Sequence, residues 1–171
     1  MEEITLKENL TSRLVKTALI AAIYAVLTII LAPISYGPVQ FRLSEILVLL
    51  AFIDPIYIIG LTLGCFLANL FGGLGIMDLV FGTIATFLSV SAISLTSKFI
   101  KHRLTSLIIS SLWPTIFNGV IIGWMLNYVL QVPLLLTMFQ VGIGEFVVVT
   151  IIGVPVFKLI SDKYKNKLSI Q

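Results

Sequence analysis

Long stretches of this chain contain no charged side chain, and this feature limits the possible folds more than any other. The longest stretch covers residues 104–144. Across the 171 residues, 58% are hydrophobic and 11% are charged, whereas roughly 25% of the residues in a soluble domain are charged. A water-soluble fold of this length cannot hide so much apolar surface. We therefore expect lipid to surround most of the chain, which forms one multi-pass membrane domain.

Backbone hydrogen bonds decide which structures can cross that lipid. They must be satisfied within helices or a closed barrel, and the apolar runs lack the alternation of strands. We predict an all-α, polytopic membrane bundle of six transmembrane helices, at residues 14–31, 45–53, 56–70, 78–97, 104–128 and 133–160. The second is too short to cross about 30 Å of hydrocarbon, so it must thin the membrane, extend backward or pack inside the bundle. The first run is longer than a usual signal-peptide core, so we do not expect it to be cleaved.

Lysine and arginine residues predict the orientation of the bundle. If the N-terminus is cytoplasmic, six crossings return the C-terminus there, and every basic residue except Arg42 lies inside. Cytoplasmic loops are enriched in such residues, so we predict an N-in, C-in protein of the cell membrane. Residues 1–13 form its cytoplasmic N-terminal segment, 14–160 its membrane domain and 161–171 a basic cytoplasmic tail that anchors at anionic lipid.

Ionisable residues at membrane depth are costly and are often functional. The clearest is Glu145, in the outer half of the sixth predicted helix, as a ligand contact, a protonated acid or an ion-pair partner of Arg42. Other polar residues gather in the same outer half, which favours an outward-facing pocket for a polar, planar ligand, cationic or neutral. The candidate contacts are Glu145, Asn118, Asn69, Asp78, Arg42, Glu45, Tyr36 and Gln140.

Several of these residues have structural alternatives. Asn118 can hold two helices together, and Asp78 can cap the start of the fourth helix. Arg42 and Glu45 lie three positions apart and can pair with each other. Tyr36 fits an aromatic belt at the outer interface.

Other patterns narrow the class of protein. The chain has no phosphate-binding loop, no hydrolase motif and no cluster of metal ligands, so we expect neither an enzyme nor a bound metal or cofactor. We attribute the net charge of +3 to basic residues that orient the protein in the membrane, and not to nucleic-acid binding. Uphill transport would then need energy from another subunit. In the first helix, Ala18 and Ala22, and likewise Ala21 and Ala25, are spaced for close helix packing, within this bundle or against a separate membrane protein.

The segment at residues 35–45, Ser-Tyr-Gly-Pro-Val-Gln-Phe-Arg-Leu-Ser-Glu, resembles the signature of the QueT family. Members of this family are substrate-binding S-components of energy-coupling factor (ECF) transporters. Segments 64–73, 78–86, 117–119 and 141–145 are similar to family motifs and occur in the same order. The resemblance extends over residues 14–155, nearly the whole chain.

This resemblance implies an S-component that captures a queuosine precursor, 7-aminomethyl-7-deazaguanine or queuine, outside the cell. It also implies assembly with a transmembrane coupling subunit and two cytoplasmic ATPases. The family's small-residue strip contacts the coupling subunit; it maps onto Ala18 and Ala22, with Ala21 and Ala25 as further candidates. The alternative is an S-component or stand-alone carrier for a different vitamin-like heterocycle.

The ligand that the resemblance implies assigns roles to the candidate contacts. A carboxylate can accept the adjacent N–H donors of a deazaguanine, and Glu145 is the first choice for this role. Asn118 or Asn69 could read the carbonyl and ring nitrogen. Glu45 or Asp78 could pair with the cationic amine, while Arg42 is assigned to orienting a carboxylate.

Overall fold

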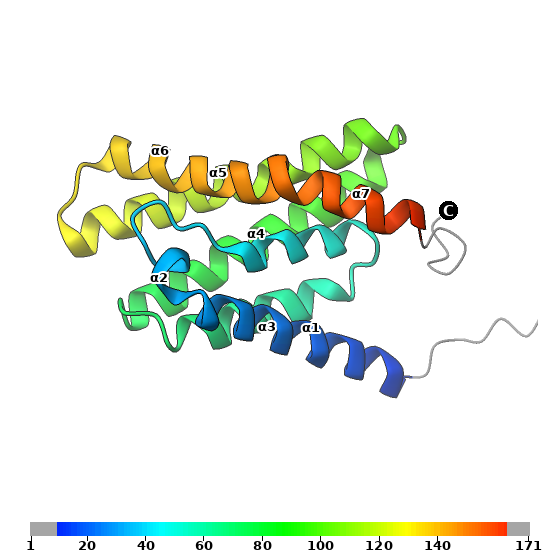
Figure 1. The fold of residues 1–171 in the computed structure, drawn as a ribbon, viewed down its shortest axis with the longest axis horizontal. Coiled ribbons are helices and arrows are strands. Elements are labelled where there is room, and N and C mark those ends of the chain that lie inside the picture. The colour runs from blue at the N-terminus through cyan, green and yellow to red at the C-terminus, as the bar shows by residue number, and fades with distance from the viewer. Residues whose placement is uncertain (1–9, 164–171) are drawn as a thin grey trace, which may run out of the picture.

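The structure is a computed structural model that describes residues 10–163, and each regular element in this range is helical (Figure 1). This agrees with the predicted all-α class. In chain order the elements are α1 (Leu10–Ile30), α2 (Ala32–Ser35), the 3₁₀ helix η1 (Leu43–Phe52), α3 (Tyr57–Asn69), α4 (Ile76–Phe99), α5 (Arg103–Leu130), α6 (Leu134–Glu145), the π-helix η2 (Phe146–Gly153) and α7 (Val154–Lys163).

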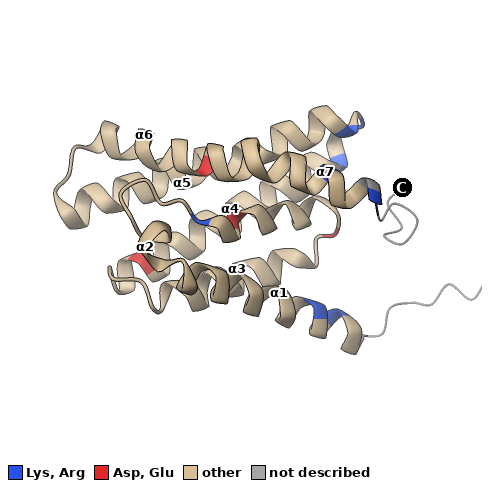
Figure 2. Ribbon diagram, in the orientation of Figure 1, with Lys and Arg blue, Asp and Glu red and all other residues tan. Residues whose placement is uncertain are grey.

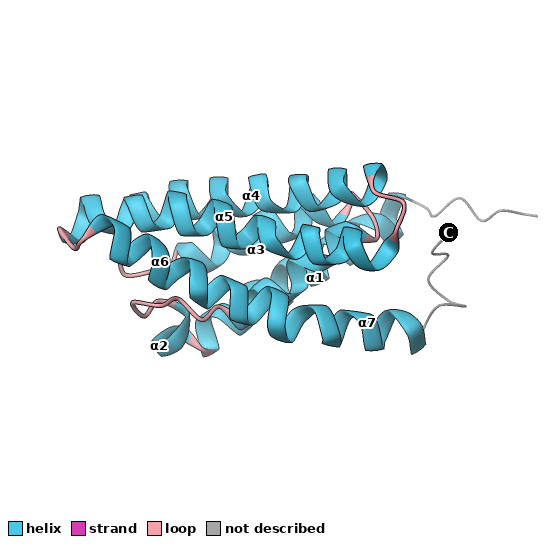
Figure 3. Cartoon of the chain, turned by 90° about the horizontal axis from the view of Figure 1, so that it is seen from above, coloured by secondary structure: helices cyan, strands magenta, loops and turns pink. Residues whose placement is uncertain are grey.

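Four helical rods in the described part of the chain are long and apolar enough to cross a membrane. They cover Thr11–Ile30, Ile76–Phe99, Arg103–Leu130 and Leu134–Ser161, while Leu43–Phe52 and Tyr57–Asn69 are shorter apolar helices. The last rod joins α6, η2 and α7 along the length of the bundle (Figures 1 and 3). The six predicted apolar helices are therefore present in order, and the count of six crossings stays a prediction.

The predicted boundaries are close to the observed ones but not identical. Helix α1 begins inside the segment predicted as cytoplasmic, and α7 continues into the predicted basic tail. Residues 1–9 and 164–171, which make up most of those two segments, lie outside the described residues. The second helix begins at Leu43 rather than at residue 45. In its first turn, the Ser44 hydroxyl lies 2.6 Å from that of Thr28 on α1.

The short helix η1 lies inside the bundle, which was one of the three outcomes expected for it. It contacts α1, α3, α4, α5, η2 and α7. Its residues Val48, Leu49 and Ala51 are fully buried. Around it, α5 packs between α4 and α6, and α1 packs against α3. An apolar helix surrounded by protein does not need the length of a membrane span.

Glycine allows α1 and α3 to touch. A Cβ atom built on Gly64 would lie 2.9 Å from the carbonyl oxygen of Ala21 and 3.1 Å from its Cα. Small residues commonly allow such close approaches between membrane helices. Ala21 and Ala25 are buried within the bundle, while Ala18 and Ala22 are exposed. The two alanine pairs of α1 therefore have different surroundings.

The outer surface and the interior have the polarity expected of a protein surrounded by lipid. Large apolar side chains are widely exposed, among them Ile76, Phe99 and Leu135 at 77%, 81% and 79%. Many buried residues are polar, as described below. The described lysines and arginines gather at the end of the bundle where α1 begins, α4 meets α5 and α7 ends (Figure 2), whereas Arg42 is buried. The predicted N-in, C-in orientation would produce this distribution.

Candidate functional site

The loop between α2 and η1 carries Arg42 into the bundle interior. The Tyr36 hydroxyl donates a hydrogen bond of 2.6 Å to the carbonyl of Ala68 on α3, which fixes the start of the loop. The backbone N–H of Gln40 bonds the carbonyl of Gly37 at 3.1 Å, and that of Arg42 bonds the carbonyl of Gln40 at 2.8 Å. The loop therefore places Arg42 at the N-terminal end of η1, where the Arg42 side chain is only 4% exposed.

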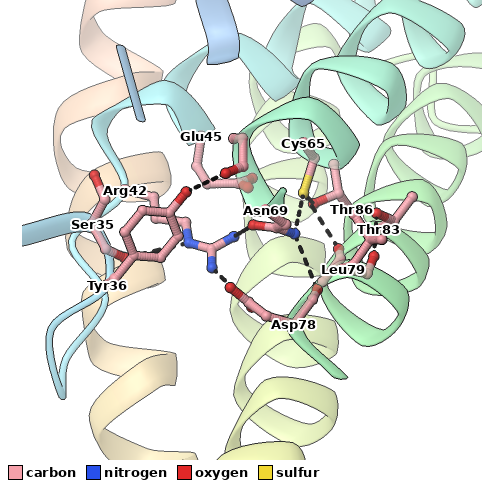
Figure 4. A network of polar contacts seen from close by, with 12 residues as sticks. Ser35, Tyr36, Arg42, Glu45, Cys65, Asn69, Asp78, Leu79, Thr83 and Thr86 are labelled. Carbon is pink, nitrogen blue, oxygen red and sulfur yellow. Dashed lines mark hydrogen bonds and ion pairs between the residues drawn. The ribbon is translucent and has the colours of Figure 1, made fainter. Parts of the chain in front are cut away.

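Arg42 is the centre of a buried polar network (Figure 4). Its guanidinium donates to the side-chain oxygen of Asn69 at 3.3 Å and forms an ion pair of 3.5 Å with Asp78. Its Nε donates to the carbonyl of Ser35 at 3.4 Å, and its Cζ lies 5.3 Å from the ring centroid of Tyr36. Burial disfavours the charge, but Asp78 and the other acidic groups nearby, Cys65, Tyr24 and Glu45, together outweigh this and raise the pKa of Arg42. The ion-pair partner is thus Asp78, rather than Glu45 or Glu145, which the sequence offered as alternatives.

Asn69 is oriented by the groups around it. Its side-chain NH₂ donates to the Cys65 sulfur at 3.3 Å and to the backbone carbonyl of Asp78 at 3.2 Å. The Thr86 hydroxyl also donates to that sulfur, at 3.2 Å. These contacts direct the Asn69 oxygen toward Arg42. Asn69 therefore positions Arg42 and joins α3 to α4.

Asp78 lies in the first turn of α4, but it does not cap the helix. Helix α4 begins at Ile76, and its N-cap is Gly75, whose φ is +64°. The capping alternative for Asp78 is therefore wrong. Asp78 is 1% exposed, and one carboxylate oxygen bonds Arg42 while the other has no hydrogen-bond partner. An unpartnered buried oxygen of this kind is available to a ligand.

Three further candidates are also buried in the bundle. Glu45 on η1 is 1% exposed; one carboxylate oxygen accepts a hydrogen bond from the Tyr24 hydroxyl, and the other has no partner. Glu145, the last residue of α6, and Asn118 on α5 are 2% and 4% exposed. One Glu145 oxygen and the Asn118 amide nitrogen are also buried without a hydrogen-bond partner. Glu145 interacts electrostatically with Glu45 and Arg42. The buried set thus contains three carboxyl groups but one guanidinium.

A cavity of about 380 Å³ lies next to this network. Its wall combines the α2–η1 loop, the start of α4, the end of α5 and the first half of α6. The lining residues are Tyr36, Gly37, Pro38, Gln40, Gly73, Leu74, Asp78, Leu126, Leu130, Val132, Pro133, Leu136, Thr137 and Gln140. These segments lie away from the end of the bundle where α1 begins and α7 ends (Figure 1).

The structure divides the eight predicted contacts into two groups. Tyr36, Asp78 and Gln140 line the cavity. The other five are buried and are not among the lining residues: Arg42, Glu45, Asn69, Asn118 and Glu145.

Sequence reasoning missed two polar residues of the cavity wall, Gln40 and Thr137. Thr137 lies three positions before Gln140, so helical spacing could have placed both on one face. Gln40 lies within the signature segment, two positions before Arg42. Its sequence context gave no indication that the side chain is buried. Among residues 10–163, no three His, Cys, Asp or Glu side chains are placed to hold a metal ion.

These features define a class: a helical, multi-pass membrane protein with a ligand-sized cavity near one end of its bundle. The sequence profile described as "QueT transporter" matches residues 14–162. A curated relative, the queuosine precursor transporter QueT of Lactococcus lactis subsp. cremoris (strain MG1363), is 34% identical over 149 residues. The alignment covers 82% of this chain and 88% of that relative. The chain therefore belongs to the QueT transporter family, as its motifs predicted. No solved structure matches it.

Proposed function

We propose that this protein is the substrate-binding membrane subunit of an ECF-type ABC transporter. It captures a queuosine precursor, 7-aminomethyl-7-deazaguanine or queuine, outside the cell and delivers it inward with an ATP-driven coupling module. The observation that carries the proposal is the cavity beside a buried acidic network, in a chain of the QueT transporter family. In the proposed N-in, C-in orientation with six crossings, this cavity faces outward.

The charge of the site favours a ligand that carries a protonated amine. Asp78 is paired with Arg42, whereas Glu45 and Glu145 are buried carboxyl groups without an ion-pair partner among the described residues, and a cationic ligand nearby would favour the ionised form of such a group. Asp78 is the carboxylate on the cavity wall and has a free oxygen, so we assign it to the ligand amine. Arg42, paired with the other oxygen, orients this carboxylate.

We assign recognition of the base of the ligand to Glu145 and Asn118. Each of them has a buried polar atom without a hydrogen-bond partner. A carboxylate that accepts two adjacent N–H groups makes strong, charge-assisted hydrogen bonds. We therefore propose that the base extends from the cavity toward Glu145, with Asn118 reading its carbonyl. Asn69 is a weaker candidate for ligand contact, because its amide already bonds Arg42, Cys65 and Asp78.

The coupling subunit is proposed to dock on the outer face of α1. Ala18 and Ala22 are exposed there, beside the exposed apolar residues Val15, Leu19 and Val26. Small residues at this spacing leave a flat surface for another membrane helix. Ala21 and Ala25 are buried within the bundle and are left out of the proposed docking surface.

Ligand binding tests the substrate assignment. Purified protein should bind 7-aminomethyl-7-deazaguanine or queuine more tightly than guanine or riboflavin in calorimetry, and should melt at a higher temperature with the bound ligand. Glu145→Gln should weaken that binding, and unchanged affinity would remove Glu145 from the site. Tight binding to riboflavin alone would overturn the substrate. Uptake in cells that lack the coupling ATPases would favour a stand-alone carrier.

A further inference from the structure

Gln40 has a backbone conformation that glutamine rarely adopts. Its φ is +50°, and the only other non-glycine residue with positive φ among those described is Gln131, at +55°. Left-handed conformations are disfavoured for residues with a side chain, and those that persist away from helix ends are often found at functional sites. Gln131 ends helix α5, and its amide bonds the carbonyl of Tyr128 at 2.9 Å, which is a common helix ending. Gln40 does not end a helix, so its conformation needs another explanation.

Packing holds Gln40 in this conformation. The Gln40 backbone joins the two loop hydrogen bonds described above. Helix α6 lies directly against the same loop at Gly144. A Cβ atom built there would lie 3.3 Å from the Gln40 carbonyl oxygen and would overlap the carbonyl of Val39. The direction in which the Gln40 side chain leaves the backbone is therefore determined by α6 and by the entry of Arg42.

The Gln40 side chain is buried, but it has no hydrogen-bond partner among the described residues. Gln40 is 3% exposed and lines the cavity. Its amide is in none of the side-chain hydrogen bonds that connect the neighbouring network. The amide atoms are not among the fully enclosed polar atoms that lack a partner, so the small exposed part of Gln40 includes its amide. An amide without a protein partner, held beside a ligand-sized cavity by a fixed backbone, is suited to bind whatever occupies that cavity.

We propose that Gln40 is a specificity-determining residue whose amide pairs with the N3/N9–H edge of a deazaguanine free base. This inference rests on the function proposed above. An amide places an NH₂ donor beside a carbonyl acceptor, so its bidentate partner is an acceptor beside a donor. In a free deazaguanine, N3 is an acceptor and the neighbouring N9–H is a donor. The N1–H and 2-amino groups are both donors, which suits the Glu145 carboxylate instead. Gln40 thereby selects the free base over its nucleoside, in which ribose replaces the N9 hydrogen.

Binding to matched ligands tests this role in the purified full-length protein. The ligands are 7-aminomethyl-7-deazaguanine and its analogue with C–H in place of N3, which has nearly the same shape. The wild type should bind the analogue about 10-fold more weakly, which corresponds to about 1.4 kcal/mol. Gln40→Ala should bind the parent base about 10-fold more weakly than wild type does, and it should no longer distinguish the two ligands. Gln131→Ala removes a glutamine of similar backbone conformation outside the cavity wall and should behave as wild type.

A glycine variant separates recognition from support of the loop. Gln40→Gly removes the amide and also relieves the left-handed conformation. It should melt no lower than wild type but bind the parent base as weakly as Gln40→Ala. If Gln40→Gly keeps wild-type affinity, or if Gln40→Ala still discriminates against the analogue, Gln40 does not read this edge. If the wild type binds neither ligand, the proposed function itself is wrong.

Discussion

Removing the Arg42 side chain should strongly destabilise the protein, because Asp78 would stay buried without its counter-charge. Arg42 and Asp78 are 4% and 1% exposed, and their charged atoms lie 3.5 Å apart. With an effective dielectric constant of about 20, two unit charges at this separation attract each other by about 5 kcal/mol. Part of that attraction offsets the cost of burying both charges. Breaking a buried pair by removing one partner costs about 3–5 kcal/mol.

Three variants distinguish the lost charge from lost packing: Arg42→Met, Asp78→Asn and the double variant. Methionine keeps much of the apolar length of arginine, and asparagine keeps the shape of aspartate. Arg42→Met should lower the free energy of unfolding by about 3–5 kcal/mol. The double variant should recover part of this loss, because the side chain at position 78 is then neutral and no longer needs a cation.

Denaturant unfolding of the ligand-free protein in detergent measures these free energies, with helix content as the signal. Ligand is left out because Asp78 is also a proposed ligand contact. The physical argument would be refuted if Arg42→Met unfolded at the wild-type denaturant concentration. It would also be refuted if the double variant lost as much as the two single variants together, since the charges would then be independent.

Three further predictions concern packing, docking and ionisation. Gly64→Val should destabilise the protein by about 1–3 kcal/mol in thermal unfolding, because its Cβ would lie 2.9 Å from a carbonyl oxygen of α1; Gly73→Ala, with no atom within 4 Å of its Cβ, is the control. Ala18→Leu should leave melting and ligand binding unchanged but reduce ATP-dependent uptake, and normal uptake would exclude docking there. Burial raises the pKa of Tyr36. The protonated hydroxyl therefore stabilises the folded protein below pH about 10, and this stabilisation is lost as the pH rises through the raised pKa. The difference in melting temperature between wild type and Tyr36→Phe should therefore stay constant below that pH and shrink above it.

Much of the fold could be predicted because its signals are local. The third predicted helix, residues 56–70, differs from Tyr57–Asn69 by one residue at each end, and the fifth, residues 104–128, corresponds to Arg103–Leu130. Apolar runs, prolines and glycines mark such boundaries within a few residues of chain. The 3₁₀ form of Leu43–Phe52 and the π-helix at Phe146–Gly153 could not be predicted in this way. Packing against distant helices selects between hydrogen-bond patterns that differ little in local sequence.

The candidate site could be predicted in its members but not in its pairings. Glu145, Asp78 and Arg42 are conspicuous because a charge inside an apolar run is costly. Arg42 is three positions from Glu45, and sequence spacing allowed that pair. The loop instead turns the guanidinium toward α3 and α4, where Asn69 and Asp78 lie. Distances between these segments depend on the fold and are not encoded in spacing along the chain.

The sequence alone determined that this is an all-helical chain for lipid surroundings, the order of its helices, its family and the acids and amides available to a site. These follow from side-chain polarity and short motifs, which are properties of neighbouring residues. Only the tertiary structure decided that Arg42 pairs with Asp78, that Ala21 is buried while Ala18 is exposed, and that Gln40 reaches the cavity. Each of these depends on which helices pack together, because packing brings residues that are far apart in the sequence within contact distance.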